Sequence, residues 1–357
     1  MRLGIIGLPN SGKTTIFNAL TGSALETGAV SGGRFEVHTA VVGVPDERVD
    51  RLSALYNPRK TIYTQVTYAD IAGLDKGVAE GGLKGQFRNE LAQVDGYVHV
   101  VRAFADDAVP HPYETVDPAR DVEILDAEFL LTDLVAVESR LQKLQGELRV
   151  KGRGVDPAVP AEIELLETFK AQLEAERPLR DLDLTPDQQK AVRGYGFLTL
   201  KPALVVLNTD ESRPDVTLDY DHPNTRVVAL QGKIEAEIAQ LDTEDAALFM
   251  AEYGIAERSA ARVIRLSYEL LAIQSFFTVG EDEVRAWSVA VGATAPEAAG
   301  AIHSDLQKGF IRAEVMRCED LLTAGSEAAL KAAGKFRLEG KEYIVKDGDI
   351  VHIRFNL

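Results

Sequence analysis

The first turn of the chain, MRLGIIGLPNSGKTTIFNAL, constrains its fold most. A short apolar run, Leu3 to Ile6, leads into G-x-x-x-x-G-K-T, and apolar residues at helical spacing follow. Glycines let backbone N–H groups curl around a phosphate, while the lysine and the threonine hydroxyl reach the outer phosphates and a magnesium ion. A glycine-rich turn with an accidental lysine is the plain alternative, and the flanking strand and helix argue against it. The sequence therefore predicts a loop that binds a nucleoside triphosphate through Asn10, Ser11, Gly12, Lys13, Thr14 and Thr15.

Length, charge and cysteine content limit the classes of protein. With 357 residues the chain can form two or three domains, and a net charge of −17 argues against broad coating of nucleic acid, so no DNA partner is expected. No apolar run approaches a membrane span, and a first strand beginning at residue 2 leaves no room for a signal peptide. The single cysteine, Cys318, fits a reducing compartment. We therefore expect a cytoplasmic protein without a membrane partner.

A second motif follows the phosphate-binding loop. The segment TIYTQVTYADIAGL reads as a strand that ends in D-x-x-G, Asp70 to Gly73. In P-loop switches such an aspartate holds magnesium, usually through water, and the glycine N–H senses the γ-phosphate. The motif alone could be a plain turn, but its place after the loop and at a strand end indicates a nucleotide switch. We therefore expect Thr14 and Asp70 to hold Mg²⁺, and Gly73 to contact the γ-phosphate.

Several later segments read as buried parallel strands. They are Gly96–Phe104, Leu204–Asn208 and Arg226–Leu230, each nearly continuous in apolar residues. Strands that alternate with helices predict an α/β fold with a parallel-rich, doubly wound sheet and its ligand at the carboxyl ends of the strands.

Between Asp121 and about Gln189 the apolar residues recur at three- and four-residue steps, which predicts two long helices. A break, RVKGRGVDPAVP, separates them and carries glycines and prolines. We expect an inserted antiparallel helical hairpin, a coiled coil, whose tip holds Arg149, Lys151 and Arg153. This tip is either a solvated turn or a contact for a polyanion.

From about Ser275 the chain is rich in strands again. VRAWSVAVG and FIRAEVM flank a short helix around Pro296 to Gln307, and Asp347-Gly348 marks a tight turn before the last strand. One helix on a small mixed sheet predicts a compact domain, and we find no catalytic constellation in it.

The turn after the strand 204–208 lies where switch proteins of this fold read the base. GTP-binding proteins carry N-K-x-D there, whereas this chain has Asn208-Thr209-Asp210-Glu211. A glutamate displaced by one methylene should hold guanine poorly, while backbone groups can satisfy the donor and acceptor of adenine. A polar turn is the alternative, which the position argues against. We therefore expect Asn208, Thr209 and Glu211 to contact the base, with ATP bound more tightly than GTP.

Five features combine here as they do in one known family: the GLPNSGKT loop, DIAGL, N-x-x-E, the helical hairpin, and the tail VRAWSVAVGATAPEAAGAIHSDLQKGFIRAEV…EGKEYIVKDGDIVHIRF. Together they resemble the Obg-related YchF family, the Obg-like ATPases, over essentially the whole chain. The resemblance implies a cytosolic ATPase of low intrinsic rate that associates with ribosomes, and a tail folded as a TGS domain, a ubiquitin-like β-grasp module. It also implies that His111 is linked to hydrolysis, and Asn10 matches an asparagine associated with potassium in related switch proteins.

The chain departs from the family at several positions. Leu74 replaces the glutamine that orients water in many GTPases, and a hydrophobic residue there is itself a family trait. Arg34 stands at the position of a threonine that meets magnesium in the ATP-bound state, which puts family-typical hydrolysis in question. Gln231-Gly232-Lys233 replaces the usual S-A-K.

We therefore expect three domains: a P-loop nucleotide-binding domain over 1–122 and 198–274, a helical insert over 123–197, and a TGS domain over 275–357. The predicted reaction is attack of water on ATP, with Lys13, Gly73 and His111 as catalytic residues, Mg²⁺ as cofactor and K⁺ as a further candidate. The expected partner is the ribosome or its RNA, bound through the hairpin and the TGS domain. Two alternatives stay open: a GTPase of the same fold, and a nucleotide-gated ribosome-binding scaffold with little turnover.

Overall fold

The computed structural model describes residues 1–27, 36–71, 83, 85–151, 154, 156–212, 216–252, 255 and 257–356. The chain divides into two compact units. The first consists of Met1–Val41 and Thr67–Leu270, and the second of Val42–Val66 and Leu271–Leu357. No helix within the described ranges combines the length and the apolar character that a membrane span requires.

A six-stranded sheet in the order β2-β4-β1-β5-β6-β7 forms the centre of the first unit. Its strands are β1 (Arg2–Ile6), β2 (Val37–Gly43), β4 (Gln65–Ile71), β5 (Gly96–Arg102), β6 (Ala203–Asn208) and β7 (Thr225–Leu230). The pairs from β4 through β1, β5 and β6 to β7 are all parallel. Every residue of β5 and β6 is buried, as parallel strands covered on both faces require. The predicted α/β fold is confirmed.

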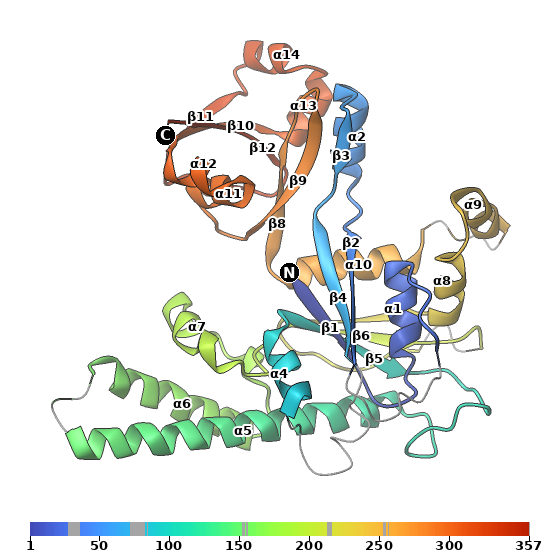
Figure 1. Cartoon of the computed structure of the whole chain (residues 1–357), viewed down its shortest axis with the longest axis vertical. Helices are drawn as coiled ribbons and strands as arrows, with labels where there is room; N and C mark the ends of the chain where they lie inside the picture. The colour runs from blue at the N-terminus through green and yellow to red at the C-terminus, as the bar shows by residue number, and fades with distance from the viewer. Residues whose placement is uncertain are drawn as a thin grey trace. The chain divides into compact units, whose positions relative to one another are not determined.

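Helices cover the sheet on two sides (Figure 1). On one side α4 (Gly85–Gln93) and the first part of α5 (Pro118–Lys151) pack through Phe87, Leu91, Leu125 and Phe129 onto the sheet residues Ile71 and Tyr97. On the other side lie α1 (Lys13–Thr21), α8 (Gly232–Ile238) and α10 (Ser259–Leu270), which contact one another or strands β6 and β7. A further helix, α9 (Thr243–Glu252), has no buried residue.

The long helix α5 continues beyond the sheet and pairs with α6 (Ala158–Glu174) as a hairpin. Leu141, Leu144, Leu166 and Phe169 form the core between the two helices, in agreement with the periodicity of the sequence. The chain then returns through η2 (Leu179–Asp181), α7 (Pro186–Val192) and η3 (Arg193–Tyr195) to β6.

A buried carboxylate fixes the base of this hairpin. Asp133 of α5 accepts hydrogen bonds from the backbone N–H groups of Leu198 and Thr199 at 2.9 and 2.7 Å, and from the Thr199 hydroxyl at 2.7 Å. Burial raises the pKa of Asp133 to about 6, although these hydrogen bonds favour the charged form. The three bonds hold α5 against the segment that leads into β6.

The second unit contains a six-stranded mixed sheet in the order β11-β10-β12-β8-β9-β3. Its strands are β3 (Lys60–Ile62), β8 (Ile273–Thr278), β9 (Glu283–Ala290), β10 (Phe310–Arg317), β11 (Arg337–Glu339) and β12 (Asp349–Phe355). Its helices are α2 (Glu47–Tyr56), α11 (Ala295–Ile302), α12 (Ser304–Lys308), α13 (Cys318–Ala324) and α14 (Glu327–Ala332). The sequence predicted one helix on this sheet, whereas the second unit contains the five helices named above.

Residues 42–66 differ from the expected boundaries. We assigned them to the nucleotide-binding domain, but α2 and β3 belong to the second unit. Val49 and Leu52 of α2 pack in one core with Phe277 and Met316, and Arg48 donates to Asp347 at 2.6 Å. The apolar face of α2 was visible in the sequence, whereas the surface that covers it depends on contacts far along the chain. The insert boundary at 123–197 and a TGS identity for the second unit remain predictions.

Candidate nucleotide-binding site

The loop between β1 and α1 has three residues with positive φ angles, a backbone conformation that favours glycine and asparagine. Gly7 and Gly12 have φ angles of 149° and 91°, and Asn10 has φ 61°. A Cβ at Gly7 would lie 2.2 Å from the Val100 carbonyl oxygen, and a Cβ at Gly12 would lie 2.2 Å from Asn208 Nδ2. Both glycines are therefore required by close approach as well as by backbone conformation. This is the geometry predicted for a phosphate-binding loop.

Lys13 begins α1 and folds back over this loop. Its Nζ donates to the carbonyl oxygens of Gly7 and Leu8 at 3.1 and 2.9 Å. No side chain caps the N-terminus of α1, so backbone N–H groups and the positive end of the helix dipole face the loop. Ser11 Oγ is buried and has no hydrogen-bond partner within the described residues. The loop and the start of α1 thus bring together a cation, backbone N–H donors and a hydroxyl, a combination that suits an anionic ligand.

Thr14 and Asp70 meet beside this loop. Thr14 Oγ1 donates to Asp70 Oδ2 at 2.8 Å, and the second carboxylate oxygen, Oδ1, is buried without a hydrogen-bond partner in the described part of the chain. Burial raises the pKa of Asp70, whereas the Thr14 hydrogen bond and the charges of Lys13 and His38 lower it. An unsatisfied carboxylate oxygen next to a hydroxyl fits a hard cation such as Mg²⁺. The two residues predicted to hold the metal are therefore close together.

Asn208, at the end of β6, makes two hydrogen bonds that the sequence did not predict, and its base-reading role remains a prediction. Its Nδ2 donates to the Ser11 carbonyl at 3.0 Å, and its Oδ1 accepts from the Gly232 N–H at 3.1 Å. Asn208 is 4% exposed, and a Cβ at Gly232 would lie 2.6 Å from Oδ1. Both ends of the amide thus tie the phosphate-binding loop to the start of α8.

The other residues of the predicted base-reading turn lie in varied surroundings. Thr209 is buried, and its backbone N–H donates to the Leu230 carbonyl at 2.9 Å. Asp210 accepts from the Ala105 N–H at 2.8 Å, and Glu211 is exposed. Thr15 is partly buried in the first turn of α1. A base-reading role for Thr209 and Glu211 remains a prediction.

The segment that follows β5 is held by a buried arginine. Arg102 is 3% exposed, and its guanidinium donates to three backbone carbonyls, those of Phe104, Asp106 and Val109, at 3.2, 3.2 and 2.8 Å. Asn10 Nδ2 donates to the carbonyl of Pro110 at 2.9 Å, which joins this segment to the phosphate-binding loop. Sequence reasoning missed Arg102, although a single charge at the end of an apolar strand was a signal.

His111 follows directly. Its side chain is 3% exposed, and its Nε2 lies 2.8 Å from Asp121 Oδ2. Sequence reasoning did not find this partner, because ten residues and a helix start separate the two. Gly73, Leu74 and Arg34 lie outside the described residues.

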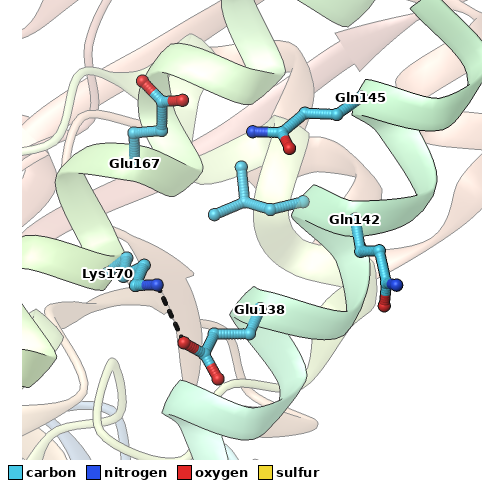
Figure 2. Close-up of a pocket in the computed structure, with 6 residues that line it drawn as sticks. Glu138, Gln142, Gln145, Glu167 and Lys170 are labelled. Carbon is cyan, nitrogen blue, oxygen red and sulfur yellow. Dashed lines mark ion pairs between the residues drawn. The ribbon is translucent and has the colours of Figure 1, made fainter.

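A separate hollow of about 270 Å³ lies on the helical hairpin, between α5 and α6. Figure 2 shows its polar rim and the ion pair between Lys170 Nζ and Glu138 Oε1, at 2.8 Å. The rim also includes Gln142, Gln145 and Glu167. This hollow is distinct from the phosphate-binding loop.

Two family profiles match the chain. Residues 2–130 match a profile described as a 50S ribosome-binding GTPase. Residues 273–356 match the C-terminal profile of YchF GTPases, described as a protein of unknown function.

Curated relatives match the chain along its whole length. The ribosome-binding ATPase YchF of Bacillus subtilis is 42% identical over 365 residues, which cover 99% of each chain. The protein of the same name from Escherichia coli O157:H7 is 42% identical over 364 residues, covering 100% of this chain and 99% of that protein. A solved structure, the YchF GTPase of Schizosaccharomyces pombe, is similar with a TM-score of 0.85 and 32% identity, covering 99% of this chain and 97% of that one.

Proposed function

Because the chain belongs to the YchF family, we propose that it is a molecular switch that binds ATP, hydrolyses it slowly and associates with the ribosome. The curated relatives are named as ribosome-binding ATPases. The observation that carries the proposal is that Lys13, Thr14 and Asp70 lie together at the loop between Gly7 and Gly12. Lys13, together with a magnesium ion that Thr14 and Asp70 would hold, can neutralise the charge that develops on a triphosphate during attack by water.

Each residue has a defined part in this proposal. Lys13 would exchange its loop carbonyls for the β- and γ-phosphate oxygens, and Thr14 and Asp70 would hold Mg²⁺, which supplies charge neutralisation when bound. Gly73 would contact the γ-phosphate, and His111 would help to place water. A slow rate follows from Leu74, which cannot orient water as a glutamine does.

The base and the monovalent cation belong to the same proposal. Asn208, Thr209 and Glu211 would favour ATP over GTP, because the carboxylate is displaced from the position that grips guanine. Asn10 donates its Nδ2 to Pro110, so a potassium ion would use its amide oxygen. A GTPase of the same fold is the second candidate, since one matching family profile describes a GTPase and the Schizosaccharomyces pombe relative is named as one.

The ribosome is the proposed partner, bound through the hairpin and the C-terminal domain, which we take to be a TGS domain. This partnership also implies a place in the cytoplasm. The relatives' names support ribosome binding as a whole, and the basic residues near the hairpin tip, such as Arg149, suit contact with RNA phosphates.

Calorimetric titration with ATP and GTP in the presence of Mg²⁺, combined with phosphate release, tests the reaction. We expect tighter ATP binding, slow release of phosphate, and loss of both in Lys13→Ala. Lys143→Ala, an exposed lysine on α5, is the control that should leave both unchanged. Tighter GTP binding would move the assignment to the GTPase, and tight ATP binding without release would favour the nucleotide-gated scaffold.

Cosedimentation with purified ribosomes tests the partner. We expect more protein in the ribosome pellet with a non-hydrolysable ATP analogue than with ADP. Equal and negligible amounts with either nucleotide would contradict the ribosomal part of the proposal.

A further inference from the structure

His111 makes protein contacts with both of its ring nitrogens. Nδ1 accepts a hydrogen bond from the Tyr113 backbone N–H at 3.1 Å, so the proton of the neutral ring is assigned to Nε2, which lies 2.8 Å from Asp121 Oδ2. With a side chain that is 3% exposed, neither nitrogen can reach water or a phosphate in this arrangement. A role in hydrolysis therefore requires His111 to break these contacts and adopt another orientation.

Asp121 is a firmly held acceptor. It is 2% exposed, and its other oxygen, Oδ1, accepts from Arg120 Nε and Nη2 at 3.0 and 2.7 Å. The same guanidinium donates to the Thr115 carbonyl at 2.7 Å and stacks 5.3 Å from the centre of the Tyr113 ring. The segment that carries His111 is thus fastened to the first turn of α5 around one carboxylate.

The opposite side of this segment is fastened to the phosphate-binding loop. Asn10 donates to the carbonyl of Pro110, the residue directly before His111. Asn10 itself has a φ of 61°, inside the loop that would close around phosphates. A change of the loop on binding nucleotide would therefore act one residue away from His111.

We propose that Asp121 is a positioning residue that holds His111 in a stored orientation, and that nucleotide at the phosphate-binding loop releases it through the Asn10–Pro110 hydrogen bond. This inference rests on the proposed function, because it assigns a regulation to the same site. Asp121 does not contact the nucleotide. It acts on the reaction only through His111.

Phosphate release by variants tests the consequence for the reaction. Nucleotide shifts the equilibrium between the stored and released orientations of His111 but does not complete it. Because a hydrogen bond to a charged group shifts an equilibrium by roughly ten- to a hundredfold, Asp121→Ala should raise kcat by several-fold or more at unchanged KM for ATP. The gain should vanish in the double variant with His111→Ala. Asp121→Asn serves as the test if Asp121→Ala fails to fold. It keeps an acceptor oxygen but loses the charge, so it should give a smaller gain in kcat. Asp117→Ala removes a carboxylate of the same helix start that does not contact His111, and should leave the rate unchanged.

A fall in kcat in Asp121→Ala, or a gain that survives the loss of His111, would overturn the inference. An unchanged rate in a folded variant that binds ATP would do the same.

A second measurement does not depend on hydrolysis. Diethyl pyrocarbonate labels accessible neutral imidazoles, and mass spectrometry resolves the sites. In the nucleotide-free protein His111 should be protected like the buried His99, while His303, with a side chain 64% exposed, should react. Asp121→Ala, or a non-hydrolysable ATP analogue with Mg²⁺, should make His111 reactive.

Rapid labelling of His111 in the nucleotide-free protein, or continued protection in Asp121→Ala, would refute the stored orientation. If the wild-type protein binds ATP but releases no phosphate, the proposed ATPase activity fails, and labelling still decides whether nucleotide releases His111.

Discussion

Replacing Asn208 by alanine tests the join between the phosphate-binding loop and the rest of the first unit. The change removes the hydrogen bonds at 3.0 Å to the Ser11 carbonyl and at 3.1 Å from the Gly232 N–H. Both partners are buried and would lose their hydrogen bond. Each unsatisfied buried group costs about 1–3 kcal/mol, so with two such groups the free energy of unfolding should fall by about 2–6 kcal/mol.

The chain contains a matched control for this change. Asn18 is also buried, at 7% exposure, and also makes two hydrogen bonds, both with the backbone of Leu25, at 2.8 and 3.1 Å. Asn18→Ala should therefore also destabilise the protein, by less than Asn208→Ala because Leu25 is only partly buried, without touching the phosphate-binding loop. Guanidinium unfolding followed by circular dichroism measures the stability of both variants, and calorimetric titration measures their ATP affinity.

We expect both variants to lose stability and only Asn208→Ala to lose ATP affinity, by tenfold or more. Asn208→Asp should be worse still for binding, because it places a second oxygen against the Ser11 carbonyl in place of a donor. The reasoning is refuted if Asn208→Ala binds ATP as the wild type does, or if Asn18→Ala weakens binding equally.

Three further changes have expected outcomes. Thr14→Ala removes one oxygen proposed to hold Mg²⁺, so the Mg²⁺ concentration needed for half-maximal ATP binding should rise; an unchanged titration would contradict this. Burial lowers the pKa of His99 to about 3, below its unfolded value, so stability should fall as the pH drops below 6.5, by about 2 kcal/mol at pH 5. The loss of unfolding free energy between pH 7 and pH 5 should be smaller in His99→Gln than in the wild type, whereas His303→Gln should lose as much as the wild type. Arg48→Ala should destabilise the second unit by about 1–2 kcal/mol, measured by fluorescence of the single tryptophan, whereas the exposed Arg59→Ala should not.

Sequence alone was sufficient wherever local backbone geometry or periodicity sets the structure. The glycine spacing from Gly7 to Gly12 predicts a loop that a Cβ would block, and the structure has that loop. The apolar run of β5 predicts a strand buried on both faces, and every residue of it is buried. The helical hairpin followed from a repeat of three and four residues. In each case the cause lies within a few residues of its effect.

Tertiary structure decided which distant surfaces meet. The apolar face of α2 is evident in the sequence, but only the folded chain shows that it packs on the second unit. Asn208 lies in a predicted base-reading motif, and only the structure shows that its amide also hydrogen-bonds to Ser11 and Gly232, which are 197 and 24 residues away. A sequence pattern reports that a polar side chain or an apolar face needs a partner. The partner itself is chosen by packing and hydrogen bonding across the whole fold, and no local pattern encodes it.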